Sequence, residues 1–351
     1  MKILIITLSG IGDALMFTPA LKLLRKSLPD AELDALVMYR GAKEIFESNP
    51  NFNKVIHFNF LEEGASKSLK FLLQLRKKYD ASINVYPANR KEYNFISFLI
   101  GAKERAGVVY LRKNRTNLNS LNNIKVLEND NVHNVRTNIK LCEALIGKKY
   151  SEEPPLEFQI TNEEKDKARK YFNEVGISSE ELVVGFHPGC ATLKNHIKRR
   201  WVPEKFAELA KKLINNHSAR ILIFGGPEEK ELKEQISSLI NSERVNVVNA
   251  ESLTKSSAIM QRCKIIVTND SSQMHIAAAL GLKVVAIIGP TNQNYIHPWK
   301  TEHQIVSLNL DCSPCFFYSP TPLICHRTDV MFKCIKELTV EMVYQSVEKY
   351  L

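Results

Sequence analysis

The feature that most constrains the fold of this chain is a short strand followed by a polar turn and a helix rich in small residues. The apolar residues 265–267 lead into Asp270 and Ser271, and residues 277–279 are alanines at helical positions. Acidic and hydroxyl side chains cap helix starts, and alanines let a helix lie close to a sheet. The first N–H groups of a helix lack partners and lie at its positive end, so this start can hold a phosphate. An ordinary capped helix of an α/β domain is the alternative.

A second turn of this kind stands near the amino terminus. The apolar residues 3–6 are followed by Ser9-Gly10-Ile11-Gly12-Asp13, whose glycines suit a tight turn that a ligand approaches. Leu15 stands where a dinucleotide fingerprint needs a third small residue, which disfavours a nicotinamide cofactor and hydride transfer. Asp13 would repel a diphosphate but can take a proton from a hydroxyl. The alternative is that Asp13 only caps the helix.

Short motifs follow one another along nearly the whole chain. In order they are Ser9-Gly10-Ile11-Gly12-Asp13 with Thr18-Pro19-Ala20-Leu21, His187-Pro188-Gly189, residues 198–209, Phe224-Gly225-Gly226-Pro227-Glu228-Glu229, residues 270–275, and Gly289-Pro290-Thr291. Together they resemble the ADP-heptose:lipopolysaccharide heptosyltransferases, glycosyltransferase family nine. Two departures are an extra position between the basic run and Pro203, and Ser272, where relatives often carry glycine.

The resemblance implies an α/β fold of two Rossmann-like, doubly wound lobes (GT-B type) with a cleft between them. A chain of 351 residues is also long for one core. We expect residues 1–155 to bind the acceptor and residues 156–338 to bind the nucleotide sugar. Residues 339–351 form a helix with an apolar face, which the resemblance implies crosses back to the first lobe. Packing on its own lobe is the alternative.

The resemblance also implies a reaction. A heptose would move from ADP-heptose to a hydroxyl of the lipopolysaccharide inner core, on a lipid A-linked Kdo or heptose, with inversion at the anomeric carbon. Asp13 would be the general base, with no metal and no cofactor required. Two other classes stay open. One is an enzyme of the same architecture with another nucleotide sugar or acceptor, or a nucleotide-sugar isomerase, and the other is a non-catalytic nucleotide-binding scaffold.

The candidate donor-binding residues lie at strand ends and helix starts of the second lobe. They are His187, Lys198, Arg199, Arg200, Glu228, Glu229, Asp270, Ser271, Ser272 and His275. The resemblance implies that Asp270 binds the donor sugar, while the N–H groups of Ser271 and Ser272 and one of the basic residues hold the diphosphate.

Each of these candidates has a plainer alternative. The glutamates can bind a ribose or sugar hydroxyl, or simply be acids in a first helical turn after Pro227. The two histidines contact the donor or are packed, and the basic run binds the diphosphate or is solvated. Trp201 is expected to pack rather than to stack on a base.

Apolar runs alternate with helical patterns in both halves, which predicts two parallel sheets with flanking helices. Strands are expected at residues 2–6, 32–37, 54–57, 81–85 and 105–109, and at residues 182–186, 219–224, 245–248, 264–267 and 284–288. The asparagine-rich residues 114–134 are predicted to be a long loop that borders the acceptor site, or a mobile surface excursion.

The 48 basic and 38 acidic residues give a net charge of +10, which favours anionic ligands or an anionic membrane surface. Residues 67–70 and 112–115 are candidate basic patches for the cytoplasmic face of the inner membrane. They are otherwise solvated charge runs. No motif for nucleic acid is present. No segment is long enough to span a bilayer, and residues 1–13 make a poor signal peptide, so a cytoplasmic location is expected.

The seven cysteines do not suggest a secreted disulfide framework. Four of them, Cys312, Cys315, Cys325 and Cys334, have a spacing that a tetrahedral zinc site could use. A disulfide or redox role and plain loop packing are the alternatives.

Overall fold

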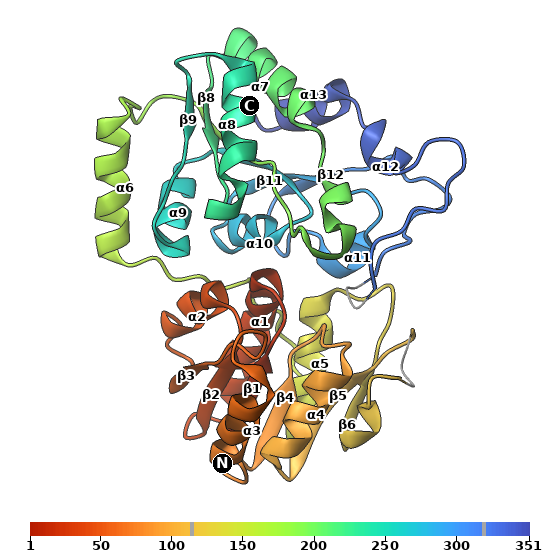
Figure 1. Ribbon diagram of the computed structural model, residues 1–351. Coiled ribbons are helices and arrows are strands. Elements are labelled where there is room, and N and C mark those ends of the chain that lie inside the picture. Colours follow the sequence, from red (N-terminus) through yellow and green to blue (C-terminus); the bar gives the residue numbers. More distant parts are fainter. Residues whose placement is uncertain (113–115, 318–320) are drawn as a thin grey trace. The chain divides into compact units, whose positions relative to one another are not determined.

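The computed structural model describes residues 1–112, 116–317 and 321–351. The chain forms two compact units, Met1–Gln159 with Asn294–Ile296, and Ile160–Gln293 with His297–Leu351 (Figure 1). Each unit holds one six-stranded sheet with helices around it. This confirms the predicted class of two doubly wound α/β lobes, while the division falls four residues beyond the expected residue 155.

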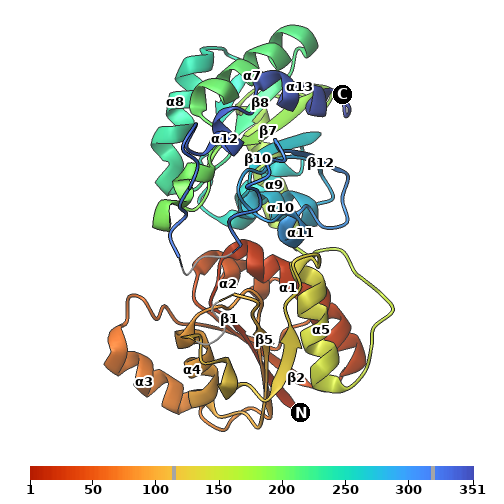
Figure 2. The same cartoon turned by 90° about the vertical axis from the view of Figure 1, so that its right-hand side faces the viewer.

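The first unit contains a parallel sheet in the order β3-β2-β1-β4-β5-β6. Its elements are β1 (Lys2–Thr7), α1 (Ile11–Ser27), β2 (Glu32–Val37), α2 (Arg40–Glu47), β3 (Lys54–His57), α3 (Gly64–Leu75), β4 (Ala81–Asn84), α4 (Lys91–Ile100), β5 (Glu104–Val109), η2 (Asn119–Leu121), β6 (Ile124–Leu127) and α5 (Asn134–Ile146). Figure 2 shows α1 and α5 on one face and α3 and α4 on the other. Strand β1 is buried beyond its first residue because both faces are covered.

The second unit repeats this topology with the order β12-β11-β10-β7-β8-β9, again parallel. Its elements are α6 (Asn162–Glu174), β7 (Val183–His187), η3 (Leu193–Arg199), α7 (Pro203–His217), β8 (Arg220–Ile223), η4 (Pro227–Glu229), α8 (Lys230–Ile240), β9 (Val245–Val247), α9 (Leu253–Met260), β10 (Ile265–Asn269), α10 (Ser272–Ala279), β11 (Lys283–Ile287), β12 (His303–Val306), α12 (Lys333–Lys336) and α13 (Val340–Glu348). The short helix α11 (Gln293–Ile296) follows β11, and its last three residues belong to the first unit.

Two strands were not predicted from the sequence. Both β6 and β12 lie at an edge of their sheet. Strand β6 alternates half-buried and exposed residues, and in β12 only Val306 is buried. Without a buried apolar run, neither gives the signal of a central strand.

The segment 114–134, expected to be a loop, contains η2 and β6. Asn117, Asn119 and Asn122 are buried in a hydrogen-bonded network, whereas Asn123, Asn129 and Asn131 are exposed. Asn117 Nδ2 donates to Asn89 Oδ1 at 2.9 Å, and Asn122 Nδ2 donates to Asn94 Oδ1 at 2.8 Å. Asn94 Nδ2 in turn donates to the carbonyl of Asn117 at 2.7 Å. From residue 116 onward, therefore, neither a structureless loop nor a surface excursion describes this segment.

The last helix, α13, packs on the second unit. Val340, Val343 and Val347 belong to the core that also contains Leu209 and Leu213 of α7. On the polar side of α13, Lys212 pairs with Glu341 at 2.5 Å. The expectation that this helix packs on the first lobe is wrong, because α7 covers its apolar face. Of the helices in the described residues, none combines the length and apolar character needed to cross a membrane.

Candidate functional site

The polar turns of the second unit meet where its strand order reverses, between the neighbouring strands β7 and β10. In doubly wound sheets, ligands bind outside the carboxyl ends of the strands at this point. Asn269, the last residue of β10, joins the surrounding turns: its Nδ2 donates to Pro188 O at 2.6 Å, and its Oδ1 accepts from Trp201 N at 3.0 Å. Sequence reasoning missed Asn269, although it directly precedes Asp270.

Arg199 and Asp270 form a buried ion pair at this edge. Arg199 Nη1 lies 2.5 Å from Asp270 Oδ2, and each side chain is 10% exposed. Thr291 Oγ1 donates to the same oxygen at 2.5 Å. Arg199 also lies over the ring of Phe316, 5.4 Å from its centroid. The Nε atoms of Arg199 and Arg200 are buried without a hydrogen-bond partner among the described residues, so two cationic side chains keep unused donors here.

Glu229 is sealed inside the unit. Its carboxylate accepts from His187 Nε2, Arg200 Nη2 and Gly226 N at 3.1, 3.1 and 3.2 Å. Burial raises its pKa, but the hydrogen bond from His187 and the charges of His187 and Arg200 outweigh burial and hold the pKa below its usual value. With three donors around it, Glu229 has little capacity left for a ribose hydroxyl.

Gly189 makes room for this carboxylate. A Cβ atom at Gly189 would lie 1.6 Å from Glu229 Oε1, a distance that no side chain tolerates. Glu228, in contrast, is exposed. Of the two candidate glutamates, only Glu228 is left at the surface for a sugar hydroxyl.

His187, the last residue of β7, lies between Glu229 and Ser271. Its Nδ1 is 2.9 Å from Ser271 Oγ, which is also 3.2 Å from Thr268 Oγ1. Ser271 precedes α10 but makes no side-chain cap to that helix. The hydroxyl is directed to His187 and Thr268, so no side chain competes with an anion for the first N–H groups of α10.

The remaining candidates of the second unit differ in exposure. Lys198 is exposed and has no hydrogen-bond or ion-pair partner in the part of the chain that the structure describes. Ser272 is half-buried at the start of α10. His275, on the same helix, is 4% exposed, and burial lowers its pKa to about 4, so it is a neutral packed side chain. Trp201 is buried against Phe206, as predicted.

In the first unit, Asp13 stands in the first turn of α1. Its Oδ2 accepts from Gly10 N at 3.0 Å, and its side chain is half-buried. The capping role is therefore present, and it is compatible with proton transfer because a carboxylate has four acceptor positions. Ser9 Oγ is buried without a partner among the described residues. A Cβ atom at Gly10 would meet only Asp13 Oδ2, at 3.7 Å, which leaves that turn open.

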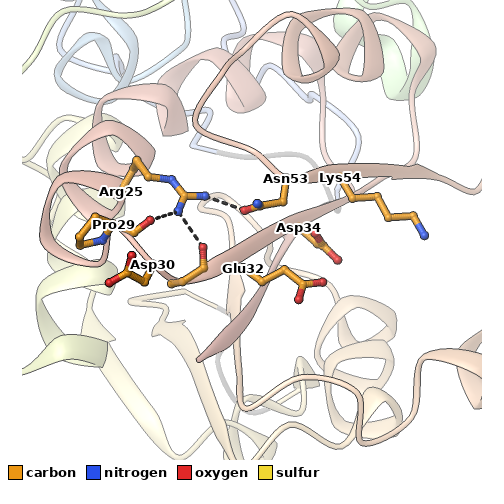
Figure 3. A pocket seen from close by; sticks show the side chains of 8 residues that line it. Arg25, Pro29, Asp30, Glu32, Asp34, Asn53 and Lys54 are labelled. Carbon is orange, nitrogen blue, oxygen red and sulfur yellow. Dashed lines mark hydrogen bonds between the residues drawn. The ribbon is translucent and has the colours of Figure 1, made fainter.

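A hollow of about 490 Å³ lies in the first unit at the amino ends of the strands, away from the carboxyl ends where the turn with Asp13 lies (Figure 3). Arg25, Asp30, Glu32, Asp34 and Lys54 are among its lining residues. The Arg25 guanidinium donates to the carbonyls of Pro29 and Ala31 and to Asn53 Oδ1. These contacts anchor the connection into β2, at the amino ends of the strands, so the hollow is separate from the turn that carries Asp13.

All seven cysteines are free thiols. Cys312 and Cys315 are exposed, Cys325 is half-buried and Cys334 is buried. In residues 1–112, 116–317 and 321–351, no group of three or more His, Cys, Asp or Glu side chains is arranged to hold a metal ion. The zinc alternative for the four clustered cysteines therefore has no support in this arrangement.

Comparison with known proteins identifies the family. The model of glycosyltransferase family 9 (heptosyltransferase) matches residues 68–321. The chain belongs to glycosyltransferase family 9. It is therefore a glycosyltransferase, as the order of its motifs indicated.

Two curated relatives of this family 9 enzyme align along most of the chain. Lipooligosaccharide heptosyltransferase 2 of Campylobacter jejuni serotype O:2 is 27% identical and covers 100% of this chain and 98% of its own. Lipopolysaccharide heptosyltransferase 2 of Escherichia coli K12 is 27% identical, with 88% of each chain covered.

Solved structures show the same fold. The E. coli ADP-heptose lps heptosyltransferase II has a TM-score of 0.76 at 23% identity, and covers 100% of this chain and 98% of its own. E. coli heptosyltransferase WaaC with ADP has a TM-score of 0.69 at 19% identity, with 99% and 97% covered.

Proposed function

We propose that this enzyme transfers a heptose from ADP-heptose to a hydroxyl of the lipopolysaccharide inner core, on a Kdo or heptose residue. The observation that carries the proposal is the set of buried cationic donors beside the start of α10. Arg199 pairs with Asp270, which directly precedes this helix start, Arg200 pairs with Glu229, and no side chain caps the first N–H groups of α10. This chemistry suits a diphosphate. The relatives named above are heptosyltransferases, which directs the choice of sugar.

In the proposed reaction the acceptor oxygen attacks the anomeric carbon as the bond from that carbon to the diphosphate oxygen breaks. The electron pair of that bond leaves with ADP, and attack from the opposite face inverts the configuration. Asp13 takes the proton of the acceptor hydroxyl. Arg199, Arg200, Lys198 and the N–H groups of Ser271 and Ser272 stabilise the charge that develops on the diphosphate. This stabilisation requires no metal, so chelators should not slow the reaction.

The remaining candidate residues have different roles in binding. We propose that Asp270 contacts the donor sugar and also holds Arg199 in place. Glu228 binds a ribose or sugar hydroxyl, since it is the exposed member of the glutamate pair. Residues 1–155 supply the acceptor site, including the turn at Ser9, Gly10 and Gly12.

The test is incubation of the enzyme with ADP-heptose and a heptose-deficient core acceptor, followed by mass measurement of the glycan. We expect one added heptose mass with the unaltered enzyme and none with Asp13→Ala. The matched control is Asp30→Ala, an exposed carboxylate of the same unit, which should keep its activity. Transfer at an unchanged rate by Asp13→Ala would remove Asp13 from the mechanism. Turnover of another ADP-sugar, with none of ADP-heptose, would show that the proposed donor sugar is wrong.

We also infer that the enzyme acts at the cytoplasmic face of the inner membrane, where its net charge of +10 would attract it to anionic lipid. Lys67 and Lys70 lie on α3, and Lys67 pairs with Glu63 at 3.1 Å. Of the other candidate patch, residues 113–115 lie outside the described residues. Cosedimentation with vesicles containing phosphatidylglycerol should exceed that with neutral phosphatidylcholine vesicles. Equal recovery with both would contradict this inference.

A further inference from the structure

Three side chains of the second unit form a continuous chain of hydrogen bonds. Ser271 Oγ lies 2.9 Å from His187 Nδ1, and His187 Nε2 lies 3.1 Å from Glu229 Oε2. His187 and Glu229 are 4% and 5% exposed, while Ser271 is half-buried. The serine hydroxyl is therefore the end of the chain that a ligand can reach.

The protonation of His187 fixes the direction of these hydrogen bonds. An ionised Glu229 can only accept, so His187 Nε2 carries a hydrogen. In neutral His187, Nδ1 is then an acceptor, and Ser271 donates its single hydrogen to it. The serine oxygen would present only lone pairs to a phosphate, which also has only acceptors.

A second proton on His187 reverses the last hydrogen bond. Nδ1–H now donates to Ser271 Oγ, and the serine hydrogen is released. Within the protein, Thr268 Oγ1 can accept it at 3.2 Å, because Thr268 donates its own hydrogen to Asn269 O at 2.8 Å. A phosphate oxygen is a stronger acceptor than a hydroxyl, so a bound diphosphate would take this hydrogen instead.

We propose that Ser271, His187 and Glu229 form a proton-linked relay, in which a second proton on His187 makes the Ser271 hydroxyl a donor to the diphosphate. Binding of the nucleotide is then accompanied by proton uptake. This inference rests on the proposed ADP-sugar function. It makes Glu229 and His187 positioning residues that act through Ser271 and Arg200.

The charges around His187 come from four elements. Glu229 of η4 faces it directly, and Arg200, after η3, lies on the other oxygen of the same carboxylate. Asp270 adjoins Ser271, and Lys233 of α8 donates to Gly225 O beside Glu229. Two of these groups are acids and two are cations. A diphosphate bound at Ser271 would add negative charge, and negative charge stabilises an imidazolium.

The test is calorimetric binding of ADP to the full-length enzyme between pH 5.5 and 8.5, in two buffers of different ionisation enthalpy. The phosphate of ADP itself takes part in proton exchange, so the unaltered enzyme is compared with His187→Gln, in which that contribution is the same. Between pH 6 and 8, the affinity of the unaltered enzyme should fall about tenfold more than that of the variant, with extra proton uptake of up to about one.

Ser271→Ala tests the relay from its other end. Loss of the hydroxyl should weaken ADP binding about tenfold at pH 6 and little at pH 8, where the hydroxyl is directed to His187. An equal loss at both pH values would overturn the relay, as would the same pH profile in His187→Gln and the unaltered enzyme. If His187→Gln does not fold, as judged by tryptophan emission, the Ser271→Ala comparison decides alone.

The control is His217→Gln, on the histidine that contacts Tyr344 OH at the end of α7. This variant should keep the pH profile of the unaltered enzyme. An absence of ADP binding at every pH would contradict the proposed donor itself and the relay with it. ADP binding without the His187 effect would overturn the relay alone.

Discussion

The Arg199 guanidinium lies 2.5 Å from the Asp270 carboxylate, and the side chain of each is only 10% exposed. The pair connects the basic run before Trp201 with the polar turn after β10. It also explains how a surface-like sequence of three consecutive cations can place one of them in the interior: Arg199 has a buried partner, whereas Lys198 is exposed.

Breaking this pair should damage both stability and catalysis. Arg199→Ala leaves Asp270 buried without its cation, which typically costs about 3 kcal/mol of unfolding free energy. Transfer activity should also fall, because a diphosphate ligand is lost. Both tryptophans, Trp201 and Trp299, belong to the second unit, so denaturant unfolding followed by tryptophan emission reports on the correct unit. Arg199→Ala with unchanged stability would contradict the buried pair.

Lys198→Ala should separate binding from stability. The side chain is exposed, so the unfolding free energy should change by less than about 0.5 kcal/mol. If Lys198 contacts the diphosphate as proposed, the KM for ADP-heptose should rise roughly tenfold. Steady-state kinetics and tryptophan-monitored unfolding of one preparation give both values. An unchanged KM would mean that Lys198 does not bind the diphosphate and that, of the three basic residues, only the arginines can do so.

Two glycine substitutions should affect different properties: Gly189→Ala should lower stability, and Gly10→Ala should lower activity without unfolding the protein. Gly189→Ala places a Cβ atom 1.6 Å from Glu229 Oε1, so we expect a loss of about 1–3 kcal/mol in the stability of the second unit. Gly10→Ala meets nothing closer than 3.7 Å and has an extended backbone that alanine adopts. The first unit should stay folded by circular dichroism, while activity falls if a ligand approaches this turn. Normal activity in Gly10→Ala would remove the turn from the site.

Acid should destabilise the second unit through His275. Burial lowers its pKa from 6.5 to about 4, so the unfolded chain binds the proton more readily than the folded unit between these values. The stability from neutral His275 is fully present above pH 6.5 and is lost as the pH falls toward 4. The full effect is about 3 kcal/mol. His275→Gln should reduce the stability difference between pH 7.5 and 4.5, whereas His217→Gln should not.

The packing of α13 predicts the effect of a single truncation. Val343 is fully buried against α7, so Val343→Ala should cost roughly 1–3 kcal/mol, visible in tryptophan emission. Gln345→Ala, on the exposed side of the same helix, is the matched control and should be neutral. A neutral Val343→Ala would mean that α13 is not part of the core of the second unit.

The central strands and the polar turns could be predicted from the sequence because they carry buried apolar runs that end in clustered polar residues. The edge strands β6 and β12 lack that signal. The unit on which α13 packs could not be predicted, because an apolar helix face does not specify what covers it. The sequence of α7, with buried Leu209 and Leu213 one turn apart, offered a partner, but only the fold brings the two helices together.

The two glutamates show the same limit within the site. Glu228 and Glu229 are adjacent in a helix start, and no pattern separates them. The fold buries one and exposes the other because successive residues on a helical turn face different directions. The requirement at Gly189 was likewise hidden, because it arises from a side chain that is 40 positions away in the sequence.

The steric clash expected from a side chain at position 189 should also link the evolution of positions 189 and 229. A homologue that lost the carboxylate at position 229 would no longer need the bare backbone at position 189, and small side chains could accumulate there. A carboxylate at position 229 combined with a larger residue at position 189 should be rare among family members. Substitution records of the two sites should therefore covary, even though glycine at position 189 has no side chain that could form a hydrogen bond.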